Sequence, residues 1–435
     1  MTTTQYEPVP TVSAEKRVER GSTIVMKFGG TSVAGPERLK AVAKRIVAAR
    51  EAGARVVAVL SAMGQTTDEL IDLAHQVSPH PAPRELDMLI SVGERISVAL
   101  AAMAINDLGH EAISLTGSQA GIVTDTVHGK AKIVDIRGQR IHDALDDDKI
   151  VLVAGFQGVS TGKEITTLGR GGSDTTAVAL AVALGAEACE IYTDVDGVYT
   201  ADPRIVPGAR KLAAISFEEM LEMSASGAKV MALRSVEFAR NYGVRLHVRS
   251  SFGDGEGTWI GEEDTRMLEK AIISGVTHDT SEAKVTIIGV PDRPGIAASV
   301  FRPLADAGVN IDMIVQNVSE QGHATISFTL PKADLGVAQP ILEETARAVG
   351  ATGVTHDSDI AKVSLIGAGM KSHPGVAADM FDALAEAGIN LEIISTSSIR
   401  VSCVVRASEV ERAVRAIHDR FGLSEDNGSR KAADA

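Results

Sequence analysis

The sequence predicts an α/β protein in which an open, mostly parallel sheet with helices on both faces is followed by two interleaved βαββαβ units. Two observations predict this architecture. In the first part of the chain, short apolar runs alternate with segments of helical spacing, which is typical of buried parallel strands joined by helices. The second part repeats its own sequence, which indicates two copies of one supersecondary unit.

Short apolar runs, many of them rich in β-branched residues, mark the strands of the first domain. The expected strands are residues 23–28, 55–60, 150–154 and 190–193. Helical spacing is expected over residues 37–50 and 91–108, and each of these segments ends near a glycine. Helices of this length between short strands predict the parallel sheet.

A dense duplication organises the C-terminal part. The stretch GVTHDTSEAKVTIIG at 275–289 returns as GVTHDSDIAKVSLIG at 353–367. In each copy a Pro-Gly pair is expected to open a helix. These pairs are Pro294-Gly295 and Pro374-Gly375. Unit one is expected at about 283–357 and unit two at about 361–421.

Unit two lacks a closing strand of its own, because the chain after Phe421 is polar. The run at 271–276, which precedes unit one, is expected to supply that edge. The two units would then interleave and could not be separated cleanly.

Glycine and acidic residues mark the boundary between the two parts. The stretch FGDGEGTWIGEED at 252–264 is typical of a hairpin or linker, and we place the boundary at about residue 265. This gives a first domain of residues 22–265 and a second of residues 266–421. Residues 1–21 are expected to be a disordered extension and residues 422–435 a polar tail.

The composition disfavours several classes of protein. A net charge of −14 makes nucleic acid and anionic membranes unfavourable partners. The two cysteines, Cys189 and Cys403, lie far apart, so a disulfide framework is not expected and both are predicted to be buried. No apolar run is long enough to cross a membrane, and the N-terminal residues do not look like a secretory signal. We expect a cytoplasmic protein.

A glycine turn follows the first predicted strand, in Lys27-Phe28-Gly29-Gly30-Thr31-Ser32. Two glycines let backbone N–H groups approach a phosphate, and a lysine at the strand end can reach the β- and γ-phosphates. The alternative is an ordinary strand and turn with a surface lysine.

A second glycine-rich loop, TTLGRGGSD at 166–174, enters an alanine-rich helix. A helix N-terminus binds anions, Arg170 can grip a carboxylate through two hydrogen bonds, and Asp174 can orient a lysine or Mg²⁺. The alternative is that Ser173 or Asp174 only caps the helix. Three glycines and an arginine exceed what a cap requires.

Three further features gather polar groups. The stretch YTDVDGVYTADPR at 192–204 leaves the carboxyl end of a strand, where ligands bind in open α/β sheets. Lys229 adds a second lysine, and Glu94, near the start of a helix, can hold a substrate ammonium. The alternatives are an acidic turn, a solvated lysine and a glutamate favoured by the helix dipole. The segment GVSTGKE at 158–164 has one residue too few for a phosphate-binding P-loop.

Taken in order, these motifs resemble those of the aspartate kinases (aspartokinases). The resemblance covers residues 23 to about 421 and is carried by KFGGTSV, SAMGQTTDEL, SVGERIS, GFQG, TTLGRGGSDTTA, YTDVDGVYTADPR, SGAKVM and the duplicated Pro-Gly blocks. It implies an amino acid kinase-type domain followed by two ferredoxin-like ACT domains, which bind amino acids.

The family transfers a phosphoryl group from ATP, which brings Mg²⁺, to L-aspartate, and the product leads to lysine, threonine and diaminopimelate. No resident metal site is expected. By resemblance, the catalytic residues are Lys27, Asp174 and Lys229. The ATP-binding positions would be Lys27, Gly29, Gly30, Ser61, Thr193, Asp194, Tyr199, Arg204, Lys229 and Val230. The aspartate-binding positions would be Thr67, Glu94, Arg170, Gly171, Gly172 and Ser173.

The resemblance also implies feedback regulation by lysine, threonine or both. The effector positions would be Asp292, Ala297, Asn310, Asp312, Gln316, Val376, Asn390 and Leu391. The expected assembly is a homodimer through the ACT domains, or an α2β2 complex with an overlapping C-terminal subunit. Two alternatives are a pure amino acid sensor with an inactive kinase domain and a kinase for another amino acid, such as glutamate.

Overall fold

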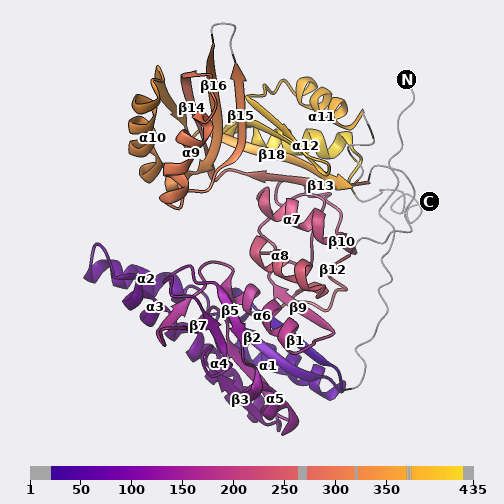
Figure 1. Cartoon of the computed structure of the whole chain (residues 1–435). Coiled ribbons are helices and arrows are strands. Elements are labelled where there is room, and N and C mark those ends of the chain that lie inside the picture. The colour runs from indigo at the N-terminus through magenta and orange to yellow at the C-terminus, as the bar shows by residue number, and fades with distance from the viewer. Residues whose placement is uncertain are drawn as a thin grey trace, which may run out of the picture.

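The structure is a computed structural model that describes residues 21–262, 272–318, 322–368, 370, 373 and 375–424. In Figure 1 the N-terminal half forms the lower body and the two repeat units form the upper one. Some predictions concern residues outside this description. These are the extension up to residue 20, the boundary at about 265, Ala271, Pro374 and the tail from residue 425.

An eight-stranded sheet of order β10-β12-β11-β9-β1-β2-β6-β3 forms the centre of the lower body. Within the described residues its neighbouring strands run parallel except β11 and β12. The strands are β1 (Thr23–Phe28), β2 (Arg55–Leu60), β3 (Ala112–Leu115), β6 (Ile150–Ala154), β9 (Ala188–Thr193), β10 (Ala214–Ser216), β11 (Leu246–Ser250) and β12 (Thr258–Gly261). The predicted open sheet is confirmed, and the described part of the glycine-rich stretch, up to residue 262, follows β11 and supplies the antiparallel strand β12.

Side-chain alternation along β1 explains the two helical layers. Ile24 and Met26 pack with α1 and α4 on one face of the sheet, whereas Val25 packs on the other face with α5, α6, α7 and α8. Because Lys27 follows the same alternation, it lies on the α6 side. The helices are α1 (Pro36–Glu51), α2 (Thr66–Val77), α3 (Pro83–Ile90), α4 (Val92–Asn106), α5 (Gln139–Asp146), α6 (Gly172–Ala183), α7 (Phe217–Ala225) and α8 (Leu233–Tyr242).

The same half contains a four-stranded sheet, of order β5-β4-β7-β8, which the sequence did not predict. Its strands are β4 (Ile122–Thr124), β5 (Ile133–Ile136), β7 (Gln157–Ser160) and β8 (Ile165–Thr167). The P-loop-like segment GVSTGKE forms the antiparallel turn between β7 and β8. It does not enter a helix, which confirms that it is no P-loop.

Helices α3 and α4 form one apolar stretch, residues 83–106, that could cross a membrane by length and composition, although half of it is buried. Asp87 and Glu94 in this stretch are each 1% exposed and hydrogen-bond within the protein. A buried helix in the core of a protein passes the same test of length and composition. The hydrogen bonds of Asp87 and Glu94 within the protein identify this stretch as part of the core.

Each repeat unit is a four-stranded antiparallel sheet with two helices packed on it. Unit one has the order β15-β16-β14-β17, and unit two has the order β13-β18-β20-β19. The elements of unit one are β14 (Glu282–Pro291), α9 (Ile296–Asp306), β15 (Asp312–Val318), β16 (His323–Pro331), α10 (Leu335–Val349) and β17 (Gly353–Asp357). Those of unit two are β18 (Ile360–Ala368), α11 (Gly375–Glu386), β19 (Ile393–Thr396), β20 (Arg400–Arg406) and α12 (Val410–Arg420).

The edge strand β13 (Ile272–Asp279) precedes unit one but pairs with β18 of unit two, antiparallel along its length. The interleaving predicted from the sequence is therefore confirmed. The predicted polar tail starts too early. Leu423 is apolar and packs in the core of unit two with 4% of its surface exposed, and Ser424 bridges to Ala209 of the lower body.

Candidate active site

The carboxyl ends of β1, β2 and β9 meet at one edge of the sheet because the three strands are parallel. Phe28 lies opposite both Leu60 and Tyr192. A backbone hydrogen bond continues this register just beyond β2, where Ser61 N donates to Phe28 O at 3.1 Å. The next residues along the three strands are Gly29, Ser61 and Thr193, all of them predicted site residues.

Lys27 and Asp174 form an ion pair between the ammonium and Oδ1. Asp174 lies in the first turn of α6, on the side of the sheet to which Lys27 points. The two side chains are 11% and 12% exposed, so the pair is largely shielded from water but still reachable. This arrangement holds a positive charge at the carboxyl edge of the sheet.

The glycine turn after β1 is tight at one position and open at the other. A Cβ on Gly30 would lie 2.9 Å from Ala62 O and 3.0 Å from Gly64 O, so a side chain there would collide with backbone. A Cβ on Gly29 would lie 3.6 Å from the Lys27 ammonium. The Gly29 backbone and the Lys27 ammonium therefore border the same space, as a phosphate site requires.

The second glycine-rich loop packs closely around Glu94. Ser173 Oγ donates to Glu94 Oε1 at 3.0 Å. A Cβ on Gly155 would lie 2.6 Å from Ser173 Oγ and 3.0 Å from Glu94 Oε1. Gly171 has a φ of +72°, and a Cβ there would lie 2.4 Å from the Cβ of Ala232. These close approaches require glycine at positions 155 and 171.

Glu94 is buried among hydrogen-bond donors. The Phe156 N–H lies 2.9 and 2.8 Å from its two oxygens, and Gln157 Nε2 lies 3.3 Å from Oε2. Burial raises the pKa of Glu94 to about 8, while these donors, Ser173 and the charge of Lys27 oppose the rise. A cation that approached Glu94 would lower that pKa and ionise the group. Phe156 and Gln157 belong to the sequence motif GFQG, but no role was predicted for these two residues from the sequence.

The end of β9 and the loop after it carry four of the predicted nucleotide-site residues. Thr193 Oγ1 donates to Asp194 Oδ1 at 3.1 Å. Arg204 is 84% exposed and pairs with Asp202 at 2.6 Å. The ring of Tyr199 contacts the core of unit two. This loop therefore links the edge of the sheet to the regulatory half.

Lys229 is exposed on the loop between α7 and α8, the loop that meets Gly171 through Ala232. The charge of Lys229 helps to lower the pKa of His278 on β13, together with burial, which is the larger cause. Within the described residues the cation paired with Asp174 is Lys27. The role of Asp174 in orienting Lys229 stays a prediction.

The remaining predicted residues of this half border the same region. Arg170 is exposed between Gly169 and Gly171, and Thr67 is half-buried in the first turn of α2. Val230 is half-buried against the core of the α6 face. Thr67 is close in sequence to Thr66, whose methyl group would lie 3.4 Å from a Cβ on Gly93, next to Glu94.

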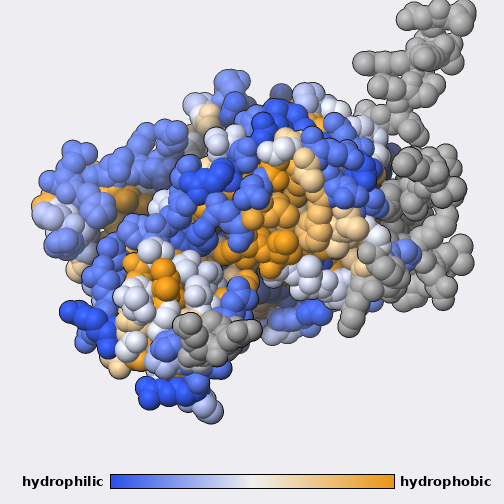
Figure 2. Space-filling model, turned by 90° about the horizontal axis from the view of Figure 1, so that it is seen from above, coloured by the Kyte–Doolittle hydropathy of each residue, from blue (hydrophilic) through white to orange (hydrophobic). Residues whose placement is uncertain are grey.

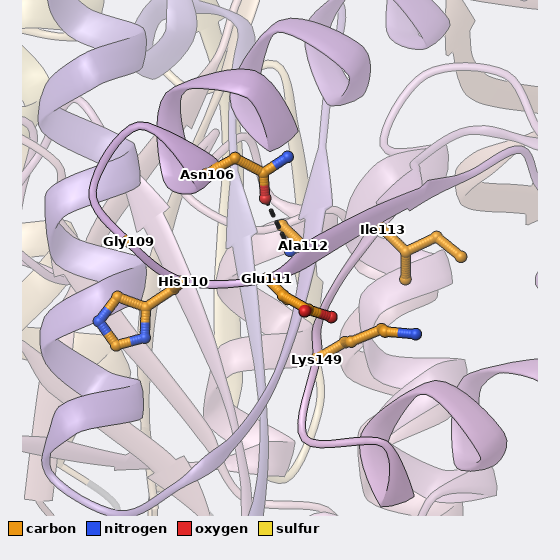
Figure 3. Close-up of a pocket in the computed structure, with 7 residues that line it drawn as sticks. All are labelled: Asn106, Gly109, His110, Glu111, Ala112, Ile113 and Lys149. Atoms are coloured by element: carbon orange, nitrogen blue, oxygen red, sulfur yellow. Dashed lines mark hydrogen bonds between the residues drawn. The ribbon is translucent and has the colours of Figure 1, made fainter.

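A pocket elsewhere in this half contains none of these residues. It is lined by Asn106, Gly109, His110, Glu111, Ala112, Ile113 and Lys149, and Asn106 Oδ1 accepts from Ala112 N at 3.0 Å (Figure 3). These residues lie at the amino ends of β3 and β6. Ligands of open parallel sheets bind at the carboxyl ends, so this pocket carries no assignment.

Across the described ranges no group of three or more His, Cys, Asp or Glu side chains could hold a metal ion. Asp174 is already engaged with Lys27. A cation at this edge would therefore depend mainly on oxygens of a ligand that arrives with it.

Comparison with known proteins decides the family. The amino acid kinase family model matches residues 22–250, and two ACT-domain models match residues 284–350 and 363–421. An aspartokinase of Mycolicibacterium smegmatis is 58% identical over 408 residues, which are 93% of this chain and 97% of that protein. The chain belongs to the aspartokinase family.

Two solved aspartokinases share its fold. E. coli aspartokinase III in complex with aspartate and ADP (R-state) is 25% identical with a TM-score of 0.80, over 92% of this chain and 100% of that one. The same enzyme in complex with lysine and aspartate (T-state) gives a TM-score of 0.71, over 92% and 99%. The chain is therefore an enzyme, a phosphotransferase with ACT regulatory domains.

In the regulatory half of this aspartokinase, one predicted effector residue joins the two units. Asp312 Oδ2 on β15 lies 2.8 Å from the ammonium of Lys362 on β18, which also contacts Glu282 at 2.7 Å. The side chain of Lys362 is fully buried. The next residue, Met313, has a φ of +46° and packs between the units.

The other predicted effector residues fall into two groups. The exposed ones are Asp292, Ala297, Asn310, Gln316 and Asn390. Leu391 is half-buried, and Val376 is 3% exposed in the core of unit two. Asp292, Ala297 and Val376 lie near the N-termini of α9 and α11, Gln316 lies on the edge strand β15, and the others lie just before β15 and β19. The exposed members of the set are accessible to a small ligand.

Proposed function

We propose that this chain transfers the γ-phosphoryl group of ATP to the side-chain carboxylate of L-aspartate, giving 4-phospho-L-aspartate and ADP. The observation that carries the proposal is the Lys27–Asp174 pair beside the open Gly29 backbone, with Glu94 close by. Phosphoryl transfer requires positioning and charge neutralisation more than covalent chemistry. A shielded ammonium at a glycine turn supplies both.

On the nucleotide side, the Lys27 ammonium would neutralise charge that develops on the transferred group. Backbone N–H groups of Gly29 and Gly30 would hold phosphate oxygens, and Lys229 would act from the nucleotide side. The loop after β9 and its neighbours would bind the rest of the nucleotide through Ser61, Thr193, Asp194, Tyr199, Arg204 and Val230. Mg²⁺ would arrive with ATP and be held largely by phosphate oxygens.

On the substrate side, Arg170 would grip a carboxylate through two hydrogen bonds. Glu94 would pair with the ammonium of the amino acid, and Thr67, Gly171, Gly172 and Ser173 would complete the pocket. The attacking carboxylate is ionised at neutral pH, so the reaction requires no general base. Glu94 is therefore free to act only as a binding group.

We infer that lysine, threonine or both inhibit the reaction from the ACT domains. E. coli aspartokinase III, a relative of known structure, was solved with lysine. In this chain, Asp292 before α9 and the Asn310 and Asn390 side chains before β15 and β19 suit an amino acid ammonium, and free N–H groups at the N-termini of α9 and α11 suit its carboxylate. The effector would alter the contacts between the units and the loop after β9.

We propose that the ACT domains also join chains, either as a homodimer or as an α2β2 complex with a separate C-terminal subunit. Seen from above, the regulatory half presents a continuous apolar area bordered by hydrophilic residues (Figure 2). On its edge strands, Ile314 is 54% exposed and Ile394 is 44% exposed. Exposed apolar areas of this kind mark protein interfaces. The mass in solution, measured by light scattering, would distinguish a dimer from other assemblies.

We also propose that the protein works in the cytoplasm. Its two cysteines are free and buried, which agrees with a reducing compartment. Cell fractionation tests this proposal.

Aspartate-dependent ADP release, with hydroxylamine to trap the acyl phosphate, tests the proposed reaction. We expect a hydroxamate with aspartate and none with glutamate. Activity with glutamate alone would indicate another amino acid kinase, and binding of lysine or threonine without any ADP release would indicate a pure sensor. Lysine and threonine, added singly and together, identify the effector and test for concerted inhibition.

A further inference from the structure

Asp87 is a buried carboxylate that the proposed reaction does not use. It lies on α3 with 1% of its surface exposed. Thr167 Oγ1 donates to its Oδ1 at 2.5 Å, His128 Nδ1 lies 2.8 Å from its Oδ2, and Gly129 N lies 3.1 Å from the same Oδ2. A carboxylate is costly to bury, and a set of donors from two other segments indicates a specific task.

These donors lie on both sides of the loop that presents Arg170. Thr167 ends β8, three residues before Arg170, and its carbonyl accepts from Ala131 N at 2.9 Å. A Cβ on Gly169 would lie 2.9 Å from Gly129 O, so the segment around Gly129 covers the loop directly. Asp87 therefore ties the start of the Arg170 loop to the segment that covers it.

The same helical stretch also carries Glu94. Residues 83–106 form one continuous stretch of helix, and positions 87 and 94 are seven residues apart, which places them on one face two turns apart. Glu94 is the proposed ammonium partner, and the loop held by Asp87 carries the proposed carboxylate partner. The consecutive helices α3 and α4, which meet at Ser91, thus relate the two binding groups.

We infer that Asp87 is a positioning residue for the acidic substrate. It fixes the Arg170 loop relative to Glu94 and so sets the affinity for a ligand that carries both a carboxylate and an ammonium. The inference rests on the proposed function, because it assumes that Arg170 and Glu94 bind aspartate. ATP should be affected little, since most of the proposed nucleotide groups lie at the ends of β1, β2 and β9 or on the loop after β9.

The test compares four variants of the full chain by separate KM values for aspartate and ATP. Asp87→Asn keeps the shape but removes the charge, and Thr167→Val removes the donor alone. We expect each to raise KM for aspartate at least tenfold, about 1.4 kcal/mol, with KM for ATP within about twofold. The double variant should be no worse than the stronger single one. Thr167→Ser, which restores the hydroxyl, should behave as the parent.

Asp125→Asn is the matched control. Its Oδ1 accepts from Val127 N at 3.2 Å and Lys132 N at 3.1 Å in the same covering segment, and among the described residues it makes no hydrogen bond to Thr167. It should leave both KM values unchanged. A parent-like KM for aspartate in folded Asp87→Asn and Thr167→Val would overturn the inference, as would equal increases in both KM values that follow a lowered Tm. Failure of the proposed function itself would appear as no aspartate-dependent ADP release by the parent chain.

Discussion

The hydroxyl of Thr200, on the loop after β9, lies 2.9 Å from Nε2 of His418 on α12. It also donates to Leu423 O at 3.1 Å, and Thr200 O accepts from Val276 N at 2.7 Å. Because a carbonyl can only accept, the hydroxyl hydrogen goes to Leu423 and a neutral His418 donates from Nε2. Burial lowers the pKa of His418, which agrees with the neutral form. One threonine ties the proposed nucleotide loop to three segments of the regulatory half.

Thr200→Val should weaken feedback inhibition. The substitution removes the hydroxyl at the junction, so an effector bound to the ACT domains would shift the loop less. We expect the concentration of the inhibiting amino acid at half inhibition to rise at least fivefold, about 1 kcal/mol of coupling, with kcat within about threefold. Thr124→Val is the control, because its buried hydroxyl pairs with Thr166 inside the kinase half. Unchanged inhibition in Thr200→Val would contradict this coupling.

Glu94 should make stability depend on pH. Its folded pKa, about 8, lies above the ordinary value of 4.5, so the folded state binds a proton more tightly than the unfolded state between these values. The free energy of unfolding should therefore fall as pH rises from 4.5 to 8. In Glu94→Gln this contribution is absent. In this range the difference in unfolding free energy between parent and variant should change by about 1.4 kcal/mol per pH unit. If urea titrations give the same pH dependence of the unfolding free energy for both proteins, this prediction is wrong.

The same group should link substrate affinity to pH. If the ammonium of aspartate pairs with Glu94, binding lowers the pKa of that carboxyl and releases a proton at neutral pH. KM for aspartate should then rise as the pH falls below about 8, the pKa of Glu94 when no substrate is bound. KM for ATP should not show this dependence on pH. A KM for aspartate that is flat between pH 6 and 9 would remove Glu94 from the ammonium site.

Gly155→Ala should damage the aspartate site selectively. The added methyl group would lie 2.6 Å from Ser173 Oγ, 2.7 Å from Ser173 Cβ and 3.0 Å from Glu94 Oε1, so both side chains would have to move. We expect KM for aspartate to rise at least tenfold. Gly138→Ala is the control, since its methyl group would make an ordinary contact of 3.5 Å with Leu184. Equal kinetics for both variants would show that the packing around Ser173 does not matter.

Lys362→Met should destabilise the regulatory half. Lys362 is fully buried and neutralises Asp312 and Glu282, so its removal leaves two carboxylates without their cation. Breaking a buried pair in this way typically costs about 3–5 kcal/mol. Lys40→Met, at an exposed pair with Glu37, should leave the urea midpoint unchanged. Adding Asp312→Asn to Lys362→Met should restore part of the loss, and a second decrease instead would contradict the ion-pair explanation.

Patterns within short stretches of the sequence predicted the strands and repeat units that such stretches form by themselves. A short apolar run identified β1, and the internal duplication identified both ACT units and the displaced strand β13. The second sheet was missed because β4 and β8 have three residues each, too few for a recognisable period. Leu423 was assigned to the tail because one apolar residue among polar ones gives no signal of its packing.

Site residues that belong to one continuous sequence motif could be predicted. Hydrogen-bond partners that come from distant segments of the chain could not. The glycine turn after Phe28 and the loop around Arg170 are local motifs. The contact of Asp87 with Thr167 joins positions 80 residues apart, and Gln157 reaches Glu94 across 63 positions. The pairing of Asp174 with Lys27, 147 positions away, also depends on how distant segments pack, which no local pattern records.

The catalytic importance of Lys27 is tested most directly by kcat for aspartate-dependent ADP formation in Lys27→Ala. Lys44→Ala is the control, an exposed lysine on α1 away from the sheet edge. We predict that kcat falls by about 10²–10³ in Lys27→Ala, as when one charge that stabilises a transition state is removed, and stays at the parent value in Lys44→Ala. A decrease of less than tenfold in folded Lys27→Ala would contradict the assignment of Lys27 to the transferred phosphoryl group.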